Sequence, residues 1–128
     1  MIKRIKHIAK KRKAEEVRKY IFIPIGKGSV KIFFKEILYF SGDGEYSDIH
    51  FVNKNTVIKV CFRLGDIERD LPEGFFFRIH KHYLANIDHI KKRFARHVVM
   101  DDDAPLAVSK AKVRLLKSIL PLLKHGKK

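Results

Sequence analysis

The sequence predicts a mainly β fold: one antiparallel domain of short strands with one or two short helices, flanked by basic helices at the N- and C-terminus. Several runs between residues 20 and 108 alternate apolar and polar side chains with the period of two that is typical of strands. Residues that favour turns separate these runs. The chain has 128 residues, 45% of them hydrophobic, which suits one domain with a modest core.

Between residues 20 and 62 the sequence predicts a series of strands. The runs at 21–25, 30–34 and 36–40 are expected to form successive strands of one antiparallel sheet. The runs at 46–52 and 57–62 are expected to form a hairpin around residues 53–56. In that hairpin Ser47, Ile49 and Phe51 share one face, and the pattern leaves open which face is buried. The expected strands are 21–25, 30–34, 36–40, 46–52 and 57–62.

Two short helices are predicted within the domain. Leu64, Ile67 and Leu71 have helical spacing, so we expect a helix over residues 63–71. A second helix is expected to begin at Ser109, whose side chain would cap it, and to continue to residue 120.

The stretch from Gly74 to Ile90 is central to the prediction. Phe75, Phe77 and Ile79 alternate with more polar residues and predict a strand whose apolar face joins the core. The spacing of the apolar residues from position 83 to 90 predicts one short helical turn or irregular segment. Asn86 lies inside that apolar set, so we expect it to be buried and to bind backbone groups.

Hydrogen-bond donors cluster where this strand ends, at Arg78, His80, Lys81 and His82. Such a cluster suits binding of an anion, although an ordinary solvated strand end gives the same pattern. The His-x-His pair also raises the possibility of zinc, but no second pair of Cys or His stands at ligand spacing, and the single Cys61 lies in an apolar run.

Two further strands are predicted at 97–100 and 105–108, with a turn between them at Asp101, Asp102 and Asp103. Because three consecutive carboxylates repel phosphates, this turn should point away from any nucleic acid.

The formal net charge is +15, and it resides at the two ends of the chain. Residues 1–19 carry nine Lys/Arg and two Glu, and residues 110–128 carry seven Lys/Arg and no acid, so each end contributes +7. Such an excess attracts polyanions, with nucleic acid the first expectation and an anionic membrane the second.

The N-terminal end predicts a weakly amphipathic basic helix, because Ile2, Ile5 and Ile8 recur at three-residue spacing. We expect a solvated linker helix, since three isoleucines bury too little area for firm attachment to a membrane. The chain contains neither an apolar run of membrane-spanning length nor a secretory signal, and it has one cysteine. A cytoplasmic location is therefore expected, without a membrane partner.

The ordered pattern from Phe76 to Ile90 resembles the signature of the LytTR family of bacterial DNA-binding domains. Three other segments are similar to family elements in the same order: Glu36–Phe40 to an early strand, Leu64–Pro72 to a short helix ending in Leu-Pro, and Val108–Lys110 to the closing Val-Ser-Arg. The resemblance covers about residues 21–120. It divides the chain into a basic extension at 1–19, a LytTR-like domain at 20–120 and a basic tail at 121–128.

The resemblance implies an all-β fold of about ten strands and sequence-specific binding of double-stranded DNA through loops in successive major grooves. Family members usually follow a receiver domain in two-component response regulators and bind paired direct repeats, often as dimers. Nineteen residues before the domain are too few for a receiver, so either a stand-alone protein or a trimmed chain is expected. The residues that the resemblance assigns to DNA binding are Ser47, Arg78, His80, Lys81, His82, Lys110 and Lys112.

The chain departs from the family where Lys81-His82 replaces Arg-Ser and Ser109-Lys110 replaces Ser-Arg. Lysine lacks the planar fork of arginine, so these positions favour contacts with phosphates over bidentate contacts with bases.

The alternative function is non-specific binding of RNA or DNA by a basic β domain, which the charge supports equally. Stacking of bases needs exposed aromatic side chains, whereas Phe75, Phe76 and Phe77 fit a core better. An enzyme is not predicted, because the sequence has no Gly-rich phosphate loop, nucleophile triad or set of metal ligands, and no cofactor is expected.

Overall fold

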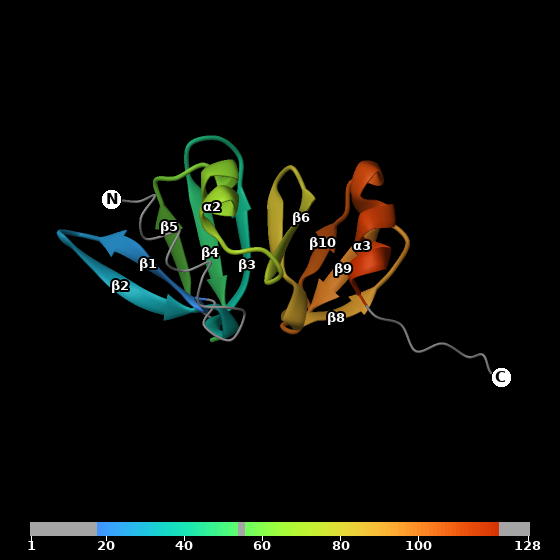
Figure 1. The fold of residues 1–128 in the computed structure, drawn as a ribbon, viewed down its shortest axis with the longest axis horizontal. Helices are drawn as coiled ribbons and strands as arrows, with labels where there is room; N and C mark the ends of the chain where they lie inside the picture. The colour runs from blue at the N-terminus through green and yellow to red at the C-terminus, as the bar shows by residue number, and fades with distance from the viewer. Residues whose placement is uncertain (1–17, 54–55, 121–128) are drawn as a thin grey trace, which may run out of the picture.

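The computed structural model describes residues 18–53 and 56–120, and within them the predicted mainly β fold is confirmed (Figure 1). The predicted N-terminal helix and the tail from residue 121 lie outside the described residues. The strands are β1 (Tyr20–Ile25), β2 (Gly28–Phe33), β3 (Ile37–Gly42), β4 (Ser47–Phe51), β5 (Val57–Val60), β6 (Phe76–His80), β7 (Tyr83–Asn86), β8 (Ile90–Arg93), β9 (His97–Met100) and β10 (Pro105–Ala107). The helices are the 3-10 turns η2 (Phe34–Glu36), η3 (Ile87–His89) and η4 (Lys110–Lys112) and the α-helices α2 (Leu64–Asp70) and α3 (Val113–Ile119).

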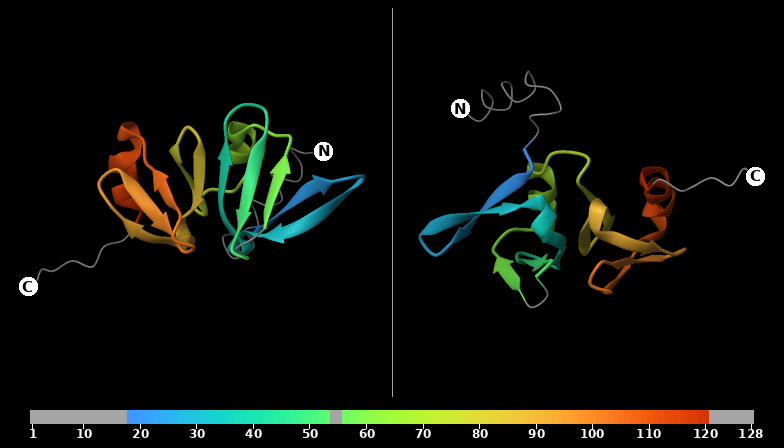
Figure 2. Two further views of the ribbon diagram at one scale, coloured as in Figure 1. Left: turned by 180° about the vertical axis from the view of Figure 1, so that it is seen from behind. Right: turned by 90° about the horizontal axis from the view of Figure 1, so that it is seen from below.

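The strands form three antiparallel sheets, with the five-stranded sheet in the middle (Figure 1). Its order is β5-β4-β3-β7-β6, and it lies between the hairpin β1-β2 and the three-stranded sheet β10-β9-β8. Both views in Figure 2 show the β1-β2 hairpin reaching outward from the side of the molecule opposite the three-stranded sheet.

The first three strands do not share one sheet, so that prediction was wrong. The 3-10 turn η2 separates β2 from β3, and buried Phe34 directs the chain from the hairpin into the five-stranded sheet. Local alternation predicts strands but carries no information about which strands pair.

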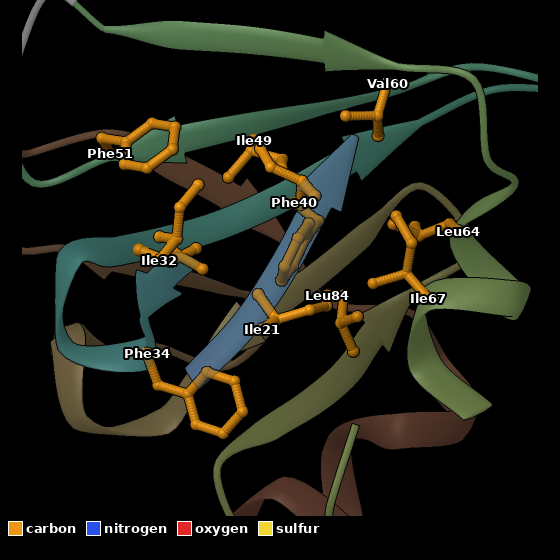
Figure 3. Packing of buried hydrophobic residues seen from close by; sticks show 12 residues of the cluster. Ile21, Ile32, Phe34, Phe40, Ile49, Phe51, Val60, Leu64, Ile67 and Leu84 are labelled. Atoms are coloured by element: carbon orange, nitrogen blue, oxygen red, sulfur yellow. The ribbon is translucent and has the colours of Figure 1, made fainter. Parts of the chain in front are cut away.

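Two hydrophobic cores lie on opposite faces of the five-stranded sheet, and β3 supplies both. Ile37 and Phe40 belong to the core under the β1-β2 hairpin and α2, whereas Leu38 and Tyr39 belong to the core under the three-stranded sheet and α3. A β-bulge between Ile37 and Tyr39 breaks the alternation, so four consecutive side chains are buried. Figure 3 shows the first core, in which residues of the hairpin, the central sheet and α2 converge.

Residues 83–90 form strand β7, the turn η3 and the start of β8, which corrects the prediction of a single helical turn or irregular segment. Strand β7 lies inside the five-stranded sheet between β3 and β6, and its two faces join different cores, Leu84 the first and Ala85 the second. Leu84, Ala85 and Asn86 are therefore all buried. A strand buried on both faces loses the period of two, so its apolar spacing resembled a helix.

Asn86 is buried and binds backbone groups, as predicted. Its amide nitrogen donates hydrogen bonds to the carbonyls of Phe34 and Ile37, both at 2.9 Å, and its side-chain oxygen accepts from Asp88 N–H at 3.0 Å. One side chain therefore holds both ends of η2 against the start of η3.

The β4-β5 hairpin and the helix α2 confirm two local predictions. Ser47, Ile49 and Phe51 form the buried face of β4. The C-terminal helix starts later than predicted: η4 precedes α3, and Ser109 caps η4 through its backbone carbonyl, which accepts from Lys112 N–H at 2.9 Å, without a side-chain hydrogen bond. Within residues 18–53 and 56–120, no helix has the length and apolar character to cross a membrane.

Candidate nucleic-acid interface

Three connecting segments lie along one edge of the molecule, the upper edge in Figure 1. They are the β3-β4 loop at residues 43–46, the β6-β7 turn at residues 81–82 and the η4 segment between β10 and α3. The sequence-based site residues fall in or beside these segments, which come from positions up to about seventy residues apart in the chain.

The β3-β4 loop exposes Tyr46 and buries Ser47. The Ser47 hydroxyl donates a 2.7 Å hydrogen bond to the carbonyl of Phe62, and the residue is 1% exposed. Tyr46 is 53% exposed. In this structure the side chain of Ser47 is therefore unavailable to a ligand, and its neighbour Tyr46 is the accessible group of the loop.

Two glycines shape this loop. A Cβ atom on Gly42 would lie 2.8 Å from Ser47 Oγ and 3.2 Å from the Tyr46 carbonyl oxygen, which is too close for any side chain. Gly44 has a φ of +117°, a conformation that side chains disfavour. The loop thus needs glycine at both positions to turn as it does.

Arg78 stabilises the β6-β7 turn from within. Its Nε donates to the His80 carbonyl at 3.0 Å and one terminal nitrogen donates to the Lys81 carbonyl at 2.7 Å. Its other terminal nitrogen donates to Glu68 Oε1 in α2 at 2.8 Å, and the side chain is only 22% exposed. Arg78 therefore positions the turn, and its guanidinium is already engaged in this conformation.

His82 connects the β6-β7 turn to the β3-β4 loop. The Gly42 N–H donates to the His82 carbonyl at 3.0 Å, and His82 Nδ1 donates to the Gly42 carbonyl at 3.0 Å. These two reciprocal bonds fix the loop and the turn side by side.

The ring of His80 is fixed by a hydrogen bond: its Nδ1 accepts from His82 N–H at 3.1 Å. Burial lowers the pKa of His80, and the nearby positive groups His82, Lys81 and Arg78 lower it further. A neutral ring that accepts at Nδ1 carries its proton on Nε2, so this nitrogen remains a donor for a ligand.

Lys81 in the β6-β7 turn and Lys110 in η4 are both exposed. Lys112 is half-buried, and its Nζ lies 5.6 Å from the centre of the Phe77 ring. The η4 segment is held beside the β6-β7 strands because Ser109 N–H donates to the Ile79 carbonyl at 2.8 Å. The structure thus brings two sets of predicted residues next to one another: those of the β6-β7 turn (Arg78, His80, Lys81 and His82) and those of η4 (Lys110 and Lys112).

Helix α2 and the residue that precedes it add two arginines that the sequence analysis missed. Arg63 and Arg69 line an open hollow together with Arg78, Lys81 and His82. Both arginines are exposed, and Arg69 also forms an ion pair with Asp66. Nothing in the local pattern of α2 indicates that the helix lies beside the β6-β7 turn, so no sequence signal could have identified them.

The hollow does not have the composition of a metal site. In the part of the chain that the structure describes, no group of three or more His, Cys, Asp or Glu side chains could hold a metal ion. His80 and His82 each use Nδ1 in the hydrogen bonds described above.

The acidic turn lies away from this edge. His89 Nδ1 contacts Asp101 Oδ2 at 2.7 Å, and His89 Nε2 donates to the carbonyl of Lys35 in η2 at 2.8 Å. The connection between β9 and β10 lies at the lower edge in Figure 1, opposite the three segments. The carboxylates of this turn are therefore separated from the basic edge, whereas Asp43 and Asp66 line the hollow itself.

Comparison with known proteins agrees with this architecture. The profile of the LytTr DNA-binding domain family matches residues 27–121, about three quarters of the chain. The chain belongs to the LytTr DNA-binding domain family. It is thus a DNA-binding domain, and the arrangement described above is a member's version of that family's fold.

Two similar proteins place this assignment in context. The LytTr DNA-binding domain of a Bacillus cereus protein has the same fold, with a TM-score of 0.66 at 17% identity, covering 82% of this chain and 99% of that one. The CO-responsive transcriptional regulator RcoM of Rhodospirillum rubrum is 26% identical over 108 residues, 78% of this chain. The match spans 45% of that regulator, so the chain corresponds to less than half of it.

Proposed function

We propose that this domain binds double-stranded DNA in a sequence-specific manner, with the β3-β4 loop, the β6-β7 turn and the η4 segment entering the major groove, and that it regulates transcription. The observation that carries the proposal is the alignment of these three segments on one edge (Figure 1). Lys81 of the turn and Lys110 of η4 are exposed, and exposed Arg63 lines the hollow together with Lys81. The major groove is about 12 Å wide and admits protein elements that contact base edges.

Within this proposal the site residues have different roles. Lys81 and Lys110 are exposed and suit contacts with phosphates, or with guanine acceptors. His80 offers its Nε2 proton, and Tyr46 offers an exposed ring and hydroxyl. Arg78 and His82 hold the turn and the loop in position through their internal hydrogen bonds.

Regulation of transcription is supported by the relative RcoM, a transcriptional regulator. A monomeric domain with three closely spaced segments covers a short site, so paired direct repeats occupied by two copies would extend it. Such a regulator acts where the chromosome is, which places the proposed function in the bacterial cytoplasm.

Selection of bound sequences from a random duplex library tests the proposal, followed by affinity measurements over a range of salt concentrations. We expect a short repeated motif, bound at least about a thousandfold more tightly than random DNA. Recovery of no motif, with affinity that collapses as salt rises, would support the alternative of a non-specific nucleic-acid-binding domain.

Single substitutions distinguish DNA binding by the proposed edge from attraction by the net charge of the domain. Lys81→Ala and Lys110→Ala should each weaken binding to the selected site. The matched control is Lys35→Ala, which removes an exposed lysine beside the acidic turn. If all three variants lose the same affinity, the effect arises from net charge and the assignment of the edge is wrong.

A further inference from the structure

An apolar groove lies between β1, the five-stranded sheet and α2, and it shares one lining residue, Asp66, with the basic hollow. Core side chains form much of its lining, and exposed Phe22 and Phe62 also border it. The groove encloses about 270 Å³. Small-molecule sites usually enclose about 300–1,000 Å³, so this groove suits a few apolar side chains better than a cofactor.

The charged residues that line the groove are both acidic. Asp66 and Asp70, one turn apart on α2, are exposed beside the apolar surface. An apolar groove bordered by carboxylates favours a segment that is apolar on one side and basic on the other.

The start of the described chain is attached at this same place. The guanidinium of Arg18 donates a 2.6 Å hydrogen bond to the carbonyl of Asp70. Residues 1–17 therefore connect to the domain at the border of the groove.

The segment before Arg18 has the complementary chemistry. Residues 1–17 contain seven Lys/Arg and two Glu, and Ile2, Ile5 and Ile8 recur at three-residue spacing. The segment is basic, and its isoleucines supply apolar side chains of a size that the groove accommodates.

We propose that residues 1–17 of the same chain dock in this groove, with the isoleucines on its apolar surface and the basic side chains beside Asp66 and Asp70. Ten residues separate Ile8 from Arg18, and an extended chain of that length spans up to about 33 Å, which is ample for a return to the groove. A short tether gives an effective concentration of about 1 mM, so even weak contacts within the chain outcompete those from a second copy at micromolar concentration.

Paramagnetic relaxation in the 128-residue chain tests the docking. Cys61 is the one cysteine of the sequence, is exposed and lies between two residues that line the groove, Val60 and Phe62. A nitroxide attached to Cys61 should broaden the amide NMR signals of residues 2–8 relative to the same sample with a reduced label. Sharp signals for residues 2–8 would overturn the proposal.

The matched control keeps every charge and removes the apolar contacts. In the triple variant Ile2→Ser, Ile5→Ser and Ile8→Ser the broadening should disappear, while the amide signals of the β-sheets stay unchanged. Broadening that persists in this variant would mean general attraction to the acidic helix, which contradicts docking in the groove.

A mixed sample distinguishes docking within a chain from docking between chains. Isotope-labelled protein without nitroxide is combined with unlabelled protein that carries it. Signals of residues 2–8 should stay sharp in this mixture, and broadening there would assign the groove to a second copy and overturn the proposal. None of these measurements involves DNA, so they do not depend on the function proposed above.

Discussion

The Arg78 guanidinium lies 2.8 Å from Glu68 Oε1, and this ion pair joins the β6-β7 turn to α2. Because Glu68 is 44% exposed at its side chain, the pair contributes little to stability, on the order of 0–1 kcal/mol. Its importance is electrostatic, since it places a carboxylate beside the edge where phosphates are expected.

Glu68→Gln should therefore strengthen binding to duplex DNA, because the change removes a negative charge and releases Arg78 from its ion pair. Lys81→Ala should do the opposite and lower the slope of log K against log salt by about one unit, as expected for one lost phosphate contact. Binding titrations at several salt concentrations measure both effects. Glu73→Gln removes an exposed carboxylate that is not the partner of Arg78; it is the matched control and should change affinity less. Unchanged affinity in Glu68→Gln would show that the carboxylate does not face the DNA.

Gly42→Ala should disturb the β3-β4 loop. The added Cβ would meet Ser47 Oγ and the Tyr46 carbonyl, so the Ser47 hydroxyl must leave its bond to Phe62. Loss of that bond costs about 0.5–1.5 kcal/mol, and the displaced loop should weaken DNA binding. Urea unfolding and DNA titration provide the two readouts.

The control for this change is Gly28→Ala, where a Cβ would have no atom within 4 Å. This variant should leave DNA affinity unaltered. Equal affinity of Gly42→Ala and the parent chain would show that the loop conformation is not needed for binding.

Asn86→Ala should be among the most destabilising polar substitutions of the chain. It leaves the buried carbonyls of Phe34 and Ile37 without their side-chain donor, and each unsatisfied buried group costs about 1–3 kcal/mol. Asn86→Asp should destabilise at least as much, because a carboxylate would face two carbonyl oxygens. Urea unfolding measures the loss of free energy, with exposed Asn53→Ala as the control expected within about 0.5 kcal/mol of the parent chain.

Features set by nearby residues were predictable from the sequence. The β4-β5 hairpin and α2 follow from alternation, helical spacing and turn residues within single short windows. The partners of Asn86 could be expected in kind, because a polar residue among apolar ones needs hydrogen bonds, although their identity depends on residues about fifty positions earlier.

Features set by distant contacts were not predictable. The Ser47 hydroxyl is engaged because it donates a hydrogen bond to a carbonyl fifteen residues later, and Arg78 is engaged because Glu68 faces it from another element. His82 meets Gly42 across forty positions. The sequence therefore predicted which residues surround the site, whereas the division between exposed and positioning side chains required the fold.

Stability should fall as the pH drops below neutrality, and His50 should contribute to that fall. Its ring stacks on Tyr39 with centroids 4.1 Å apart, and its Nε2 lies 2.9 Å from Ser41 Oγ. Burial lowers the pKa of His50, and the nearby carboxylates of Asp48 and Asp102 oppose that shift only in part. Because the unfolded chain then binds a proton more readily than the folded one, this contribution is fully present above the unfolded pKa of about 6.5 and decreases as the pH falls through that value.

Urea unfolding at pH 7.5 and pH 5.5 measures the change, and NMR titration of the His50 ring should give a midpoint below 6.5. Ionising carboxylates also affect stability in acid, so the comparison is made with His50→Gln, which cannot titrate in this range. The pH dependence of that variant should be smaller than that of the parent chain. Identical pH dependence in the two proteins would show that His50 has the same proton affinity in the folded and unfolded states, contrary to its position between Tyr39 and Ser41.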